Sequence, residues 1–214
     1  MKSRIVLLGP PASGKGTQAE LIQGRYGIPV ASPGAILREE KRRGSELGIK
    51  ADLLTQRGCL VPDLIVVNLV KQWLGRSGGI FIFDGFPRTL GQATLIEPYL
   101  TEKVMPLDMV IAFEVSLEAL QERVANRLVC SQCATSFRLG FHIHSNEDRC
   151  PRCAGGLVRR SDDTVEVLLQ RMIEYRLKTE PLIGFYKQRG ILRMLDASGR
   201  PEKVFESIVN LLEA

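Results

Sequence analysis

Long hydrophobic runs are absent from this chain of 214 residues, which has one tryptophan, two histidines and 6% aromatic residues. Its apolar stretches extend over only a few residues, whereas a helix that crosses a membrane needs about 20. Lys2 and Arg4 precede the apolar segment Ile5–Leu8, which is too short for the core of a secretory signal. We therefore expect a cytoplasmic protein with no membrane partner.

The composition lies close to the average for globular proteins, with 44% hydrophobic and 25% charged residues. It lacks the biases of disordered, collagen-like or disulfide-stabilised chains. The length suits one domain, with room for an inserted subdomain. Lys and Arg exceed Asp and Glu by 29 to 24, a net charge of +5. This modest excess fits an anionic partner such as a phosphate or a nucleic acid, and it equally fits a solvated basic surface.

Short apolar segments of β type alternate with amphipathic helical segments. Buried strands separated by helices predict an α/β fold with a central parallel sheet covered on both faces. Ser116 and Asp163 precede two helical segments and are candidate N-caps, and Pro181 is expected to kink or end the second one. The expected strands are Arg4–Leu8, Ile28–Ser32, Ile80–Phe83, Met109–Val115 and Ile191–Leu195, and the helical stretches include Gln18–Tyr26, Asp63–Leu74, Leu117–Leu128 and Val165–Tyr175.

Two segments interrupt this alternation. Residues 35–76 are mostly helical without a predicted strand, which is too long for a simple crossover. Residues 130–160 are loop-like and contain four cysteines and both histidines. We interpret both segments as insertions in one α/β core.

A glycine-rich loop, Gly9–Thr17, lies between the first predicted strand and the first helix. Backbone N–H groups of such a loop and the helix N-terminus bind phosphate oxygens, and Lys15 adds a mobile positive charge. The loop departs by one position from the pattern G-x-x-x-x-G-K-[ST], because Gly16 separates Lys15 from Thr17. The strand–loop–helix context predicts a phosphate-binding loop, and the alternative is a turn without a ligand.

The chain resembles the nucleoside monophosphate kinases, the adenylate kinase family in particular. Its loop reads G-x-x-x-x-G-K-G-T, and Asp84–Arg88 reads D-G-F-P-R, with Gln92 four residues later. Further similar elements follow in the family's order, namely Ser32–Arg38 (S-T-G-D-x-L-R in the family), the pair Arg123 and Arg127, Arg160, and Arg171. The resemblance implies a three-layer P-loop fold with a core of residues 1–32, 62–127 and 161–214. It also implies a helical acceptor-binding flap over residues 33–61 and a lid over residues 128–160.

The resemblance further implies reversible phosphoryl transfer, ATP + AMP to 2 ADP, with Mg²⁺. Such transfer crowds negative charges together, so catalysis consists mainly of positioning and of stabilisation by cations. The implied catalytic residues are Lys15, Asp84, Arg88, Arg123, Arg160 and Arg171. The implied ATP-binding residues are Ala12, Ser13, Gly14, Lys15, Gly16, Thr17, Arg127, Ser136, Phe137 and Arg200. The implied AMP-binding residues are Pro33, Arg38, Leu60, Val61, Gly85, Arg88, Gln92, Arg160 and Arg171.

Asp84 ends a predicted strand, where parallel sheets place ligand chemistry. We expect it to act on Mg²⁺ through bound water, and a helix N-cap is the alternative.

Four cysteines form a C-x₂-C-x₁₆-C-x₂-C pattern: Cys130, Cys133, Cys150 and Cys153. Two close pairs at this spacing predict a tetrahedral zinc site. Four thiolates leave no open position for a substrate, so the zinc is expected to be structural. His142 and His144 lie between the pairs and are expected to be spare, and Cys59 stands apart. The resemblance agrees, because long-lid adenylate kinases often carry such a site.

Three residues depart from the family pattern. Ala12 replaces a glycine in the phosphate loop, and a positive φ there costs an alanine roughly 1 kcal/mol or more. Pro33 replaces a threonine near the acceptor base, and Ala35 replaces an aspartate. These changes are expected to affect the choice of acceptor and the turnover rate but not the fold.

Other functions stay open beside adenylate kinase. One is a related kinase with a different nucleoside monophosphate, and another is a nucleotide-binding paralogue of low activity. The four-cysteine segment with Phe137 and Phe141 also suggests a nucleic-acid-binding module. However, the segment has no dense basic stripe, and this function would leave the phosphate loop unexplained. We expect no nucleic-acid partner and a monomer.

Overall fold

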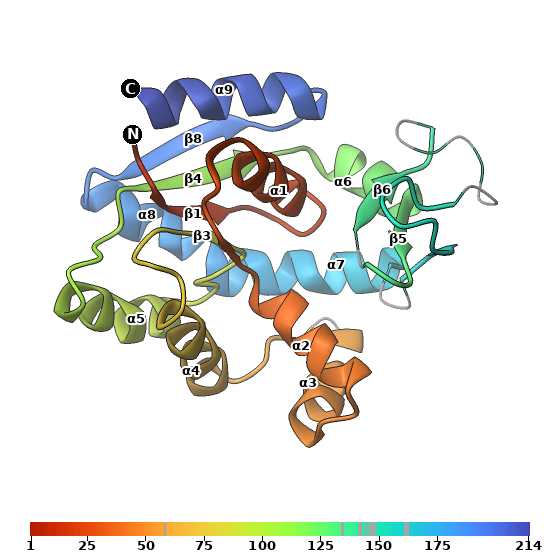
Figure 1. Cartoon of the computed structure of the whole chain (residues 1–214), viewed down its shortest axis with the longest axis horizontal. Helices are drawn as coiled ribbons and strands as arrows, with labels where there is room; N and C mark the ends of the chain where they lie inside the picture. Colours follow the sequence, from red (N-terminus) through yellow and green to blue (C-terminus); the bar gives the residue numbers. More distant parts are fainter. Residues whose placement is uncertain (58, 134, 141–142, 144, 146–148, 161–162) are drawn as a thin grey trace.

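The computed structural model describes residues 1–57, 59–133, 135–140, 143, 145, 149–160 and 163–214. Its centre is a sheet of five parallel strands in the order β2-β3-β1-β4-β8 (Figure 1). The predicted α/β fold with a central parallel sheet is confirmed. The bounds are β1 Arg4–Leu8, β2 Val30–Ala31, β3 Phe81–Asp84, β4 Met109–Glu114 and β8 Leu192–Asp196.

Alternate residues of the strands enter two separate cores. Val6 and Leu8 of β1 pack on one face of the sheet, and Ile5 and Leu7 pack on the other. All four are fully buried or nearly so, as expected for a parallel sheet covered on both sides. One face carries α1 (Lys15–Tyr26) and α9 (Pro201–Glu213), and the other carries α4 (Asp63–Leu74), α5 (Leu90–Glu102) and α8 (Pro181–Gln188).

Two further helices, α2 (Pro33–Arg42) and α3 (Glu46–Gln56), follow β2 and extend below the sheet in Figure 1. They pack tightly, because a Cβ on Gly48 would lie 2.1 Å from the backbone N of Lys41. Ser45 caps α3 by accepting a hydrogen bond from the N–H of Gly48. In the described part of residues 33–80 there is no strand, in line with the helical insertion expected for residues 35–76.

The cysteine-rich segment forms a small antiparallel sheet in the order β6-β5-β7. Its strands are β5 Arg127–Cys130, β6 Ser136–Arg138 and β7 Leu157–Val158. The prediction of a loop-like segment over residues 130–160 is therefore only partly correct, because the segment also contains strands. Strands of two to four residues give too little alternation to be seen in the sequence.

Helix α6 (Leu117–Ala125) precedes this small sheet, and α7 (Val165–Glu174) follows it. Ser116 caps α6 as expected, by accepting from the N–H of Ala119. The cap predicted at Asp163 is wrong: Thr164 caps α7 by accepting from Val167. Asp163 instead binds an arginine, as described below.

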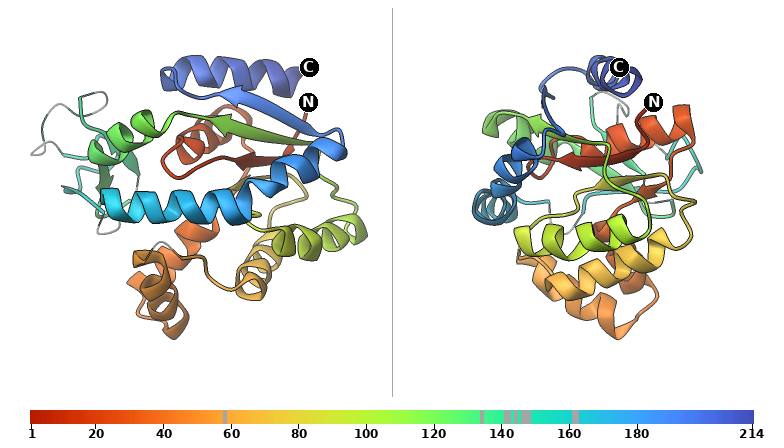
Figure 2. Two further views of the ribbon diagram at one scale, coloured as in Figure 1. Left: turned by 180° about the vertical axis from the view of Figure 1, so that it is seen from behind. Right: turned by 90° about the vertical axis from the view of Figure 1, so that its left-hand side faces the viewer.

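The chain continues from α7 through a π-helical turn, Tyr175–Thr179, and α8 then begins at Pro181. Proline suits the first turn of a helix, where its missing N–H has no partner to lose. The two helices run along the sheet from the cysteine-rich end to the opposite end (Figure 2).

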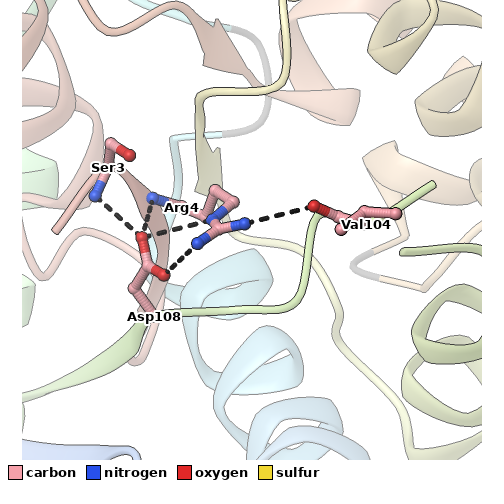
Figure 3. A network of polar contacts seen from close by, with 4 residues as sticks. All are labelled: Ser3, Arg4, Val104 and Asp108. Atoms are coloured by element: carbon pink, nitrogen blue, oxygen red, sulfur yellow. Dashed lines mark hydrogen bonds and ion pairs between the residues drawn. The ribbon is translucent and has the colours of Figure 1, made fainter. Parts of the chain in front are cut away.

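The amino ends of β1 and β4 are joined by one carboxylate (Figure 3). Asp108 accepts hydrogen bonds from the N–H groups of Ser3 and Arg4, both at 2.9 Å, and forms an ion pair with the Arg4 guanidinium at 2.7 Å. This network lies at the edge of the sheet opposite the carboxyl ends of the strands. Among the described residues, no helix has the length and apolar character needed to cross a bilayer.

Candidate active site

The loop between β1 and α1 has an unusual backbone, with positive φ at Gly9, Ala12 and Gly14. Gly9 has φ +148°, and a Cβ there would lie 2.9 Å from Cβ of Phe113, so only glycine fits. Gly14 has φ +98° and is the N-cap of α1. Ala12 also lies in the left-handed region, with φ +61°. The helix N-terminus with its unpaired N–H groups points into this loop and favours an anion there.

Lys15, the first residue of α1, folds back over the loop. Its Nζ donates to the carbonyl oxygens of Gly9 at 2.8 Å and Pro10 at 2.7 Å, and to the hydroxyl of Ser13 at 3.1 Å. Burial lowers the pKa of Lys15 to about 8, against the opposing effect of Asp84, and Arg88 and Arg127 lower it further. The ammonium thus lies among other cations, as expected of a site built for several negative charges.

Asp84 ends β3 at the carboxyl edge of the sheet. Its carboxylate lies against the first turn of α1, since a Cβ on Gly16 would be 3.5 Å from Oδ2 of Asp84. It is the acidic group whose charge acts on both Lys15 and Arg88. This position fits a carboxylate that serves a ligand at the strand ends.

Arg88 lies beside Asp84 and the start of α2. Its Nε donates to the carbonyl oxygen of Gly85 at 2.7 Å. A Cβ on Gly34 would lie 3.2 Å from Nη1 of Arg38 and 4.0 Å from Nη2 of Arg88, so two guanidinium groups meet there. Burial lowers the pKa of Arg88 by desolvation, and the positive charges of Arg171 and Arg160 lower this pKa further. The negative charge of Asp84 acts in the opposite direction. Such a cluster of guanidinium groups suits a phosphate.

The remaining residues expected for the acceptor lie around this cluster. Arg171 on α7 donates from Nη2 to the carbonyl oxygen of Thr55 on α3 at 3.4 Å. Pro33 begins α2 and is buried, and Val61, after α3, is 6% exposed. Leu60 is half-buried beside it.

Gln92 on α5 is 1% exposed and is held at both ends of its amide. Oε1 accepts from the backbone N–H of Arg88 at 2.7 Å, and Nε2 donates to Oδ1 of Asp63 at 2.8 Å. Thr89 donates its hydroxyl to Oδ2 of the same Asp63 at 2.7 Å. Asp63 is a partner of Gln92 that the sequence analysis missed, because an acidic residue in the first turn of a helix is common for reasons of the helix dipole alone.

Arg123 and Arg127 face different surroundings. Arg127 binds Asp163 through two nitrogens, with Nε to Oδ2 at 2.7 Å, and the Asp163 side chain is only 2% exposed. Arg123 donates to the carbonyl oxygens of Ser13 at 2.9 Å and Ala197 at 2.6 Å. Arg127 contributes to the lowered pKa of Lys15, whereas the pKa of Arg123 is lowered by desolvation and by Arg138. Arg127 thus acts on the charge of Lys15, whereas Arg123 binds the backbone of the phosphate loop.

A cleft of about 710 Å³ opens next to Arg123, between α6, the small sheet and the loop that precedes α9. Its lining includes Asn126, Arg138, Gly140, Gly199 and Arg200. Ser136 and Phe137, predicted at the nucleotide base, lie on the same strand as Arg138.

The four cysteines of the motif come together in the small sheet. Their Sγ atoms all lie within 4.8 Å of one another, with Cys130 to Cys153 at 3.4 Å and Cys133 to Cys150 at 3.6 Å. Four thiolates around one zinc at 2.3 Å have sulfur atoms roughly 3.8 Å apart, so the cluster fits that ion.

The surroundings of this cluster fit thiolates as well. Sγ of Cys130 accepts from the N–H groups of Gln132 at 3.4 Å and Cys133 at 3.5 Å. A Cβ on Gly155 would lie 2.8 Å from the same sulfur, so glycine allows this close approach. Phe141, His142 and His144 lie outside the described residues. Cys59 lies apart from the cluster, after α3.

A glycine-rich loop at the end of a buried strand, with a lysine, a carboxylate and several arginines around it, defines a P-loop phosphotransferase. Comparison with known proteins agrees: residues 7–191 match the family model described as adenylate kinase. The chain is 40% identical over 212 residues to the adenylate kinase of Clostridium tetani (strain Massachusetts / E88), covering 98% of each chain. It is 38% identical to the adenylate kinase of Thermodesulfovibrio yellowstonii, covering 98% of this chain and 99% of the other. The chain belongs to the adenylate kinase family, and it is a nucleoside monophosphate kinase.

Proposed function

We propose that the chain transfers the terminal phosphoryl group of ATP to AMP, giving two ADP. The observation that carries this proposal is the group of cations around Asp84 at the strand ends: Lys15, Arg88, Arg127, Arg160 and Arg171. Such a group neutralises the triphosphate of the donor and the phosphate of the acceptor when they are brought together, and a site for a single phosphate would not need it.

The donor occupies the phosphate loop in this proposal. Backbone N–H groups of residues 12–17 bind its phosphates, and Lys15 leaves its carbonyl partners to contact them. Its base enters the cleft beside Arg123 and Arg200, with Ser136 and Phe137 nearby. Arg127, held by Asp163, contacts the phosphates, so it takes the role that the family resemblance gave to Arg123.

The acceptor lies between α2 and α5. Arg38 and Arg88, which meet at Gly34, bind its phosphate, with Gly85 beside them. Its base lies near Pro33, Leu60, Val61 and Gln92. Arg160 and Arg171 contact the transferred group, where planar guanidinium groups stabilise the charge that spreads over its oxygens.

Two metals belong to this proposal. Mg²⁺ bound with ATP would neutralise phosphate charge, and Asp84 is the residue that would hold it, through coordinated water. The four cysteines hold a structural zinc, which keeps a small sheet of nine residues in strands folded as one body. Residues 128–160 then form a lid that closes over the donor and excludes water, which limits hydrolysis.

The remaining parts of the proposal concern organisation. Residues 33–61 form the acceptor flap, and residues 1–32, 62–127 and 161–214 form the core. We place the protein in the cytoplasm as a monomer.

A second candidate is a kinase for another nucleoside monophosphate, because Pro33 and Ala35 alter the acceptor side. The test measures ADP formation from Mg-ATP with AMP, UMP, CMP or GMP in parallel. Fast turnover with AMP alone supports the proposal. Preference for another acceptor supports the second candidate, and ATP binding without turnover would overturn both.

A further inference from the structure

We propose that Asp63 fixes the orientation of the Gln92 amide and so makes the enzyme select a 6-amino purine over a 6-oxo purine as acceptor. This inference rests on the proposed function, in which Gln92 contacts the acceptor base. Asp63 is the first residue of α4, where the chain returns from α2 and α3 to the main sheet. None of the roles assigned above includes it.

The hydrogen bonds around Gln92 allow only one orientation of its amide. A carboxylate only accepts and a peptide N–H only donates. Asp63 therefore requires the NH₂ group of Gln92 on its side, at 2.8 Å. The N–H of Arg88 requires the amide oxygen on the other side, at 2.7 Å. Rotating the amide by 180° would place its NH₂ group against the N–H of Arg88, two donors, and its oxygen against the carboxylate of Asp63, two acceptors.

The frame around this amide is itself fixed. The Thr89 hydroxyl caps α5 by accepting from the backbone N–H of Gln92 at 3.0 Å while it donates to Asp63 at 2.7 Å. The carbonyl oxygen of Arg88 accepts from the hydroxyl of Thr179 at 2.7 Å, and Thr179 is buried in the π-helical turn. The partners of the amide thus cannot easily move to accommodate the opposite orientation.

Gly91 gives independent evidence that the position of this carboxylate matters. A Cβ on Gly91 would lie 2.7 Å from Oδ2 of Asp63, closer than a real contact allows. Glycine is unfavourable inside a helix, and Gly91 is the second residue of α5. The missing side chain leaves the space that the carboxylate occupies.

A held amide distinguishes two kinds of purine. After its two hydrogen bonds, Gln92 retains one N–H and one oxygen lone pair. A 6-amino purine offers a donor at C6 and an acceptor at N1, and a 6-oxo purine offers the reverse. An amide free to rotate could serve either base, whereas a held amide serves one. AMP and inosine monophosphate (IMP) differ only in the group at position 6 and in the proton that IMP carries at N1, so their comparison isolates this effect.

The experiment measures kcat/KM for AMP and for IMP at saturating Mg-ATP. We expect Asp63→Ala to lower the ratio of AMP to IMP at least about tenfold, because the amide is released. Asp63→Asn keeps one acceptor oxygen and should lie between Asp63→Ala and the wild type. Gly91→Ala should lower the ratio by displacing the carboxylate, and it should have no further effect in the Asp63→Ala background. In a Gln92→Ala background, Asp63→Ala should add nothing. The KM for Mg-ATP should stay unchanged throughout.

Asp108→Asn is the matched control. Its carboxylate also binds a side chain and backbone N–H groups, but at the opposite edge of the sheet, so the ratio should not change. An unchanged ratio in Asp63→Ala, or an equal loss of kcat/KM with both acceptors, would overturn the inference. If Gln92→Ala nevertheless lowers the ratio, the proposed acceptor site stands. An unchanged ratio in Gln92→Ala would overturn both.

Discussion

Arg123 donates a 2.9 Å hydrogen bond from Nη1 to the carbonyl oxygen of Ser13 and so joins α6 to the phosphate loop. Its second terminal nitrogen donates to Ala197 at 2.6 Å, in the loop before α9. Arg127, only four residues later, binds Asp163 instead and acts on the charge of Lys15. The two arginines therefore differ in their contacts: Arg123 binds backbone carbonyl groups, whereas Arg127 binds a buried carboxylate.

Exchanging each arginine for alanine should separate these roles. Arg127→Ala should lower kcat on the order of 100-fold, because it removes a cation from the transferring phosphates. Arg123→Ala should mainly raise the KM for ATP. Steady-state kinetics with both substrates varied will show this. Arg127→Lys serves as a control, since a lysine lacks the planar fork and should recover little activity. The reverse pattern, with kcat lost only in Arg123→Ala, would contradict the assignment.

Lys15 should make ATP capture sensitive to pH. Burial lowers its pKa to about 8 in the free protein, so the ammonium loses its proton as the pH rises through that value. The value of kcat/KM for ATP, which reports on the free enzyme, should fall above about pH 8. Bound phosphates restore the proton, so kcat should stay constant to higher pH. An unchanged kcat/KM up to the ordinary lysine pKa of 10.5 would contradict this.

Two residues with positive φ should tolerate glycine with a gain in stability. Ala12 (φ +61°) and Val104 (φ +57°) both lie in the left-handed region, and Val104 is 80% exposed. Ala12→Gly should raise the free energy of unfolding by up to about 1 kcal/mol, partly offset by greater freedom of the unfolded chain. Val104→Gly should gain at least as much, because β-branched residues are strained there. Thermal melts will measure both, at about 2–4 °C per kcal/mol. A lower Tm for Val104→Gly would contradict the strain argument.

Zinc should be present at one ion per chain and should leave when the cluster is broken. Cys150→Ser removes one of the four ligands, so metal analysis should find no zinc and the Tm should fall by at least about 5 °C. Cys59→Ser is the matched control, because this cysteine lies apart from the cluster and should keep both zinc and Tm. Zinc retained in full by Cys150→Ser would contradict a four-thiolate site.

Asp108 should contribute stability that is lost in acid. Burial alone would raise its pKa, but hydrogen bonds from the Arg4 side chain and from the N–H groups of Ser3 and Arg4 lower it overall. A lowered pKa in the folded state gives stability that is complete above the unfolded value of about 3.9 and disappears as the pH falls through the folded value. Asp108→Asn should cost about 1–3 kcal/mol at neutral pH. It should also flatten the acid limb of the stability curve, measured by urea unfolding across pH. If the wild type and Asp108→Asn lose equal stability in acid, the loss is due to other titrating groups.

The sequence predicted the features that depend on local pattern. Four of the five predicted strands lie within one residue of the observed ends. Three of them, β1, β3 and β4, are buried on both faces and therefore show as continuous apolar runs. The exception, Ile28–Ser32, shortens to Val30–Ala31. The cysteine spacing predicted the cluster because it is also a local pattern: within each C-x₂-C pair, a short loop brings the two sulfur atoms together.

Contacts between distant segments could not be predicted in the same way. Nothing local distinguishes Asp163 as a partner of Arg127 from Asp163 as a helix cap, and the choice follows from where β5 and α7 meet. Asp63 and Gln92 are 29 residues apart, and only the packing of α4 on α5 joins them. The different surroundings of Arg123 and Arg127 likewise depend on the loop before α9, more than 70 residues further along the chain.

Helix α7 supports two parts of the molecule at once. It follows the cysteine-rich sheet along the chain (Figure 2). Its Arg171 donates a hydrogen bond to the carbonyl oxygen of Thr55 on α3. In the proposed function, a shift of the small sheet toward the donor would therefore move the start of a helix that also contacts the acceptor side. We expect each bound nucleotide to restrict the motion of α7 and so to lower the entropy that the other must lose on binding. The two substrates should for this reason bind with mutual cooperativity.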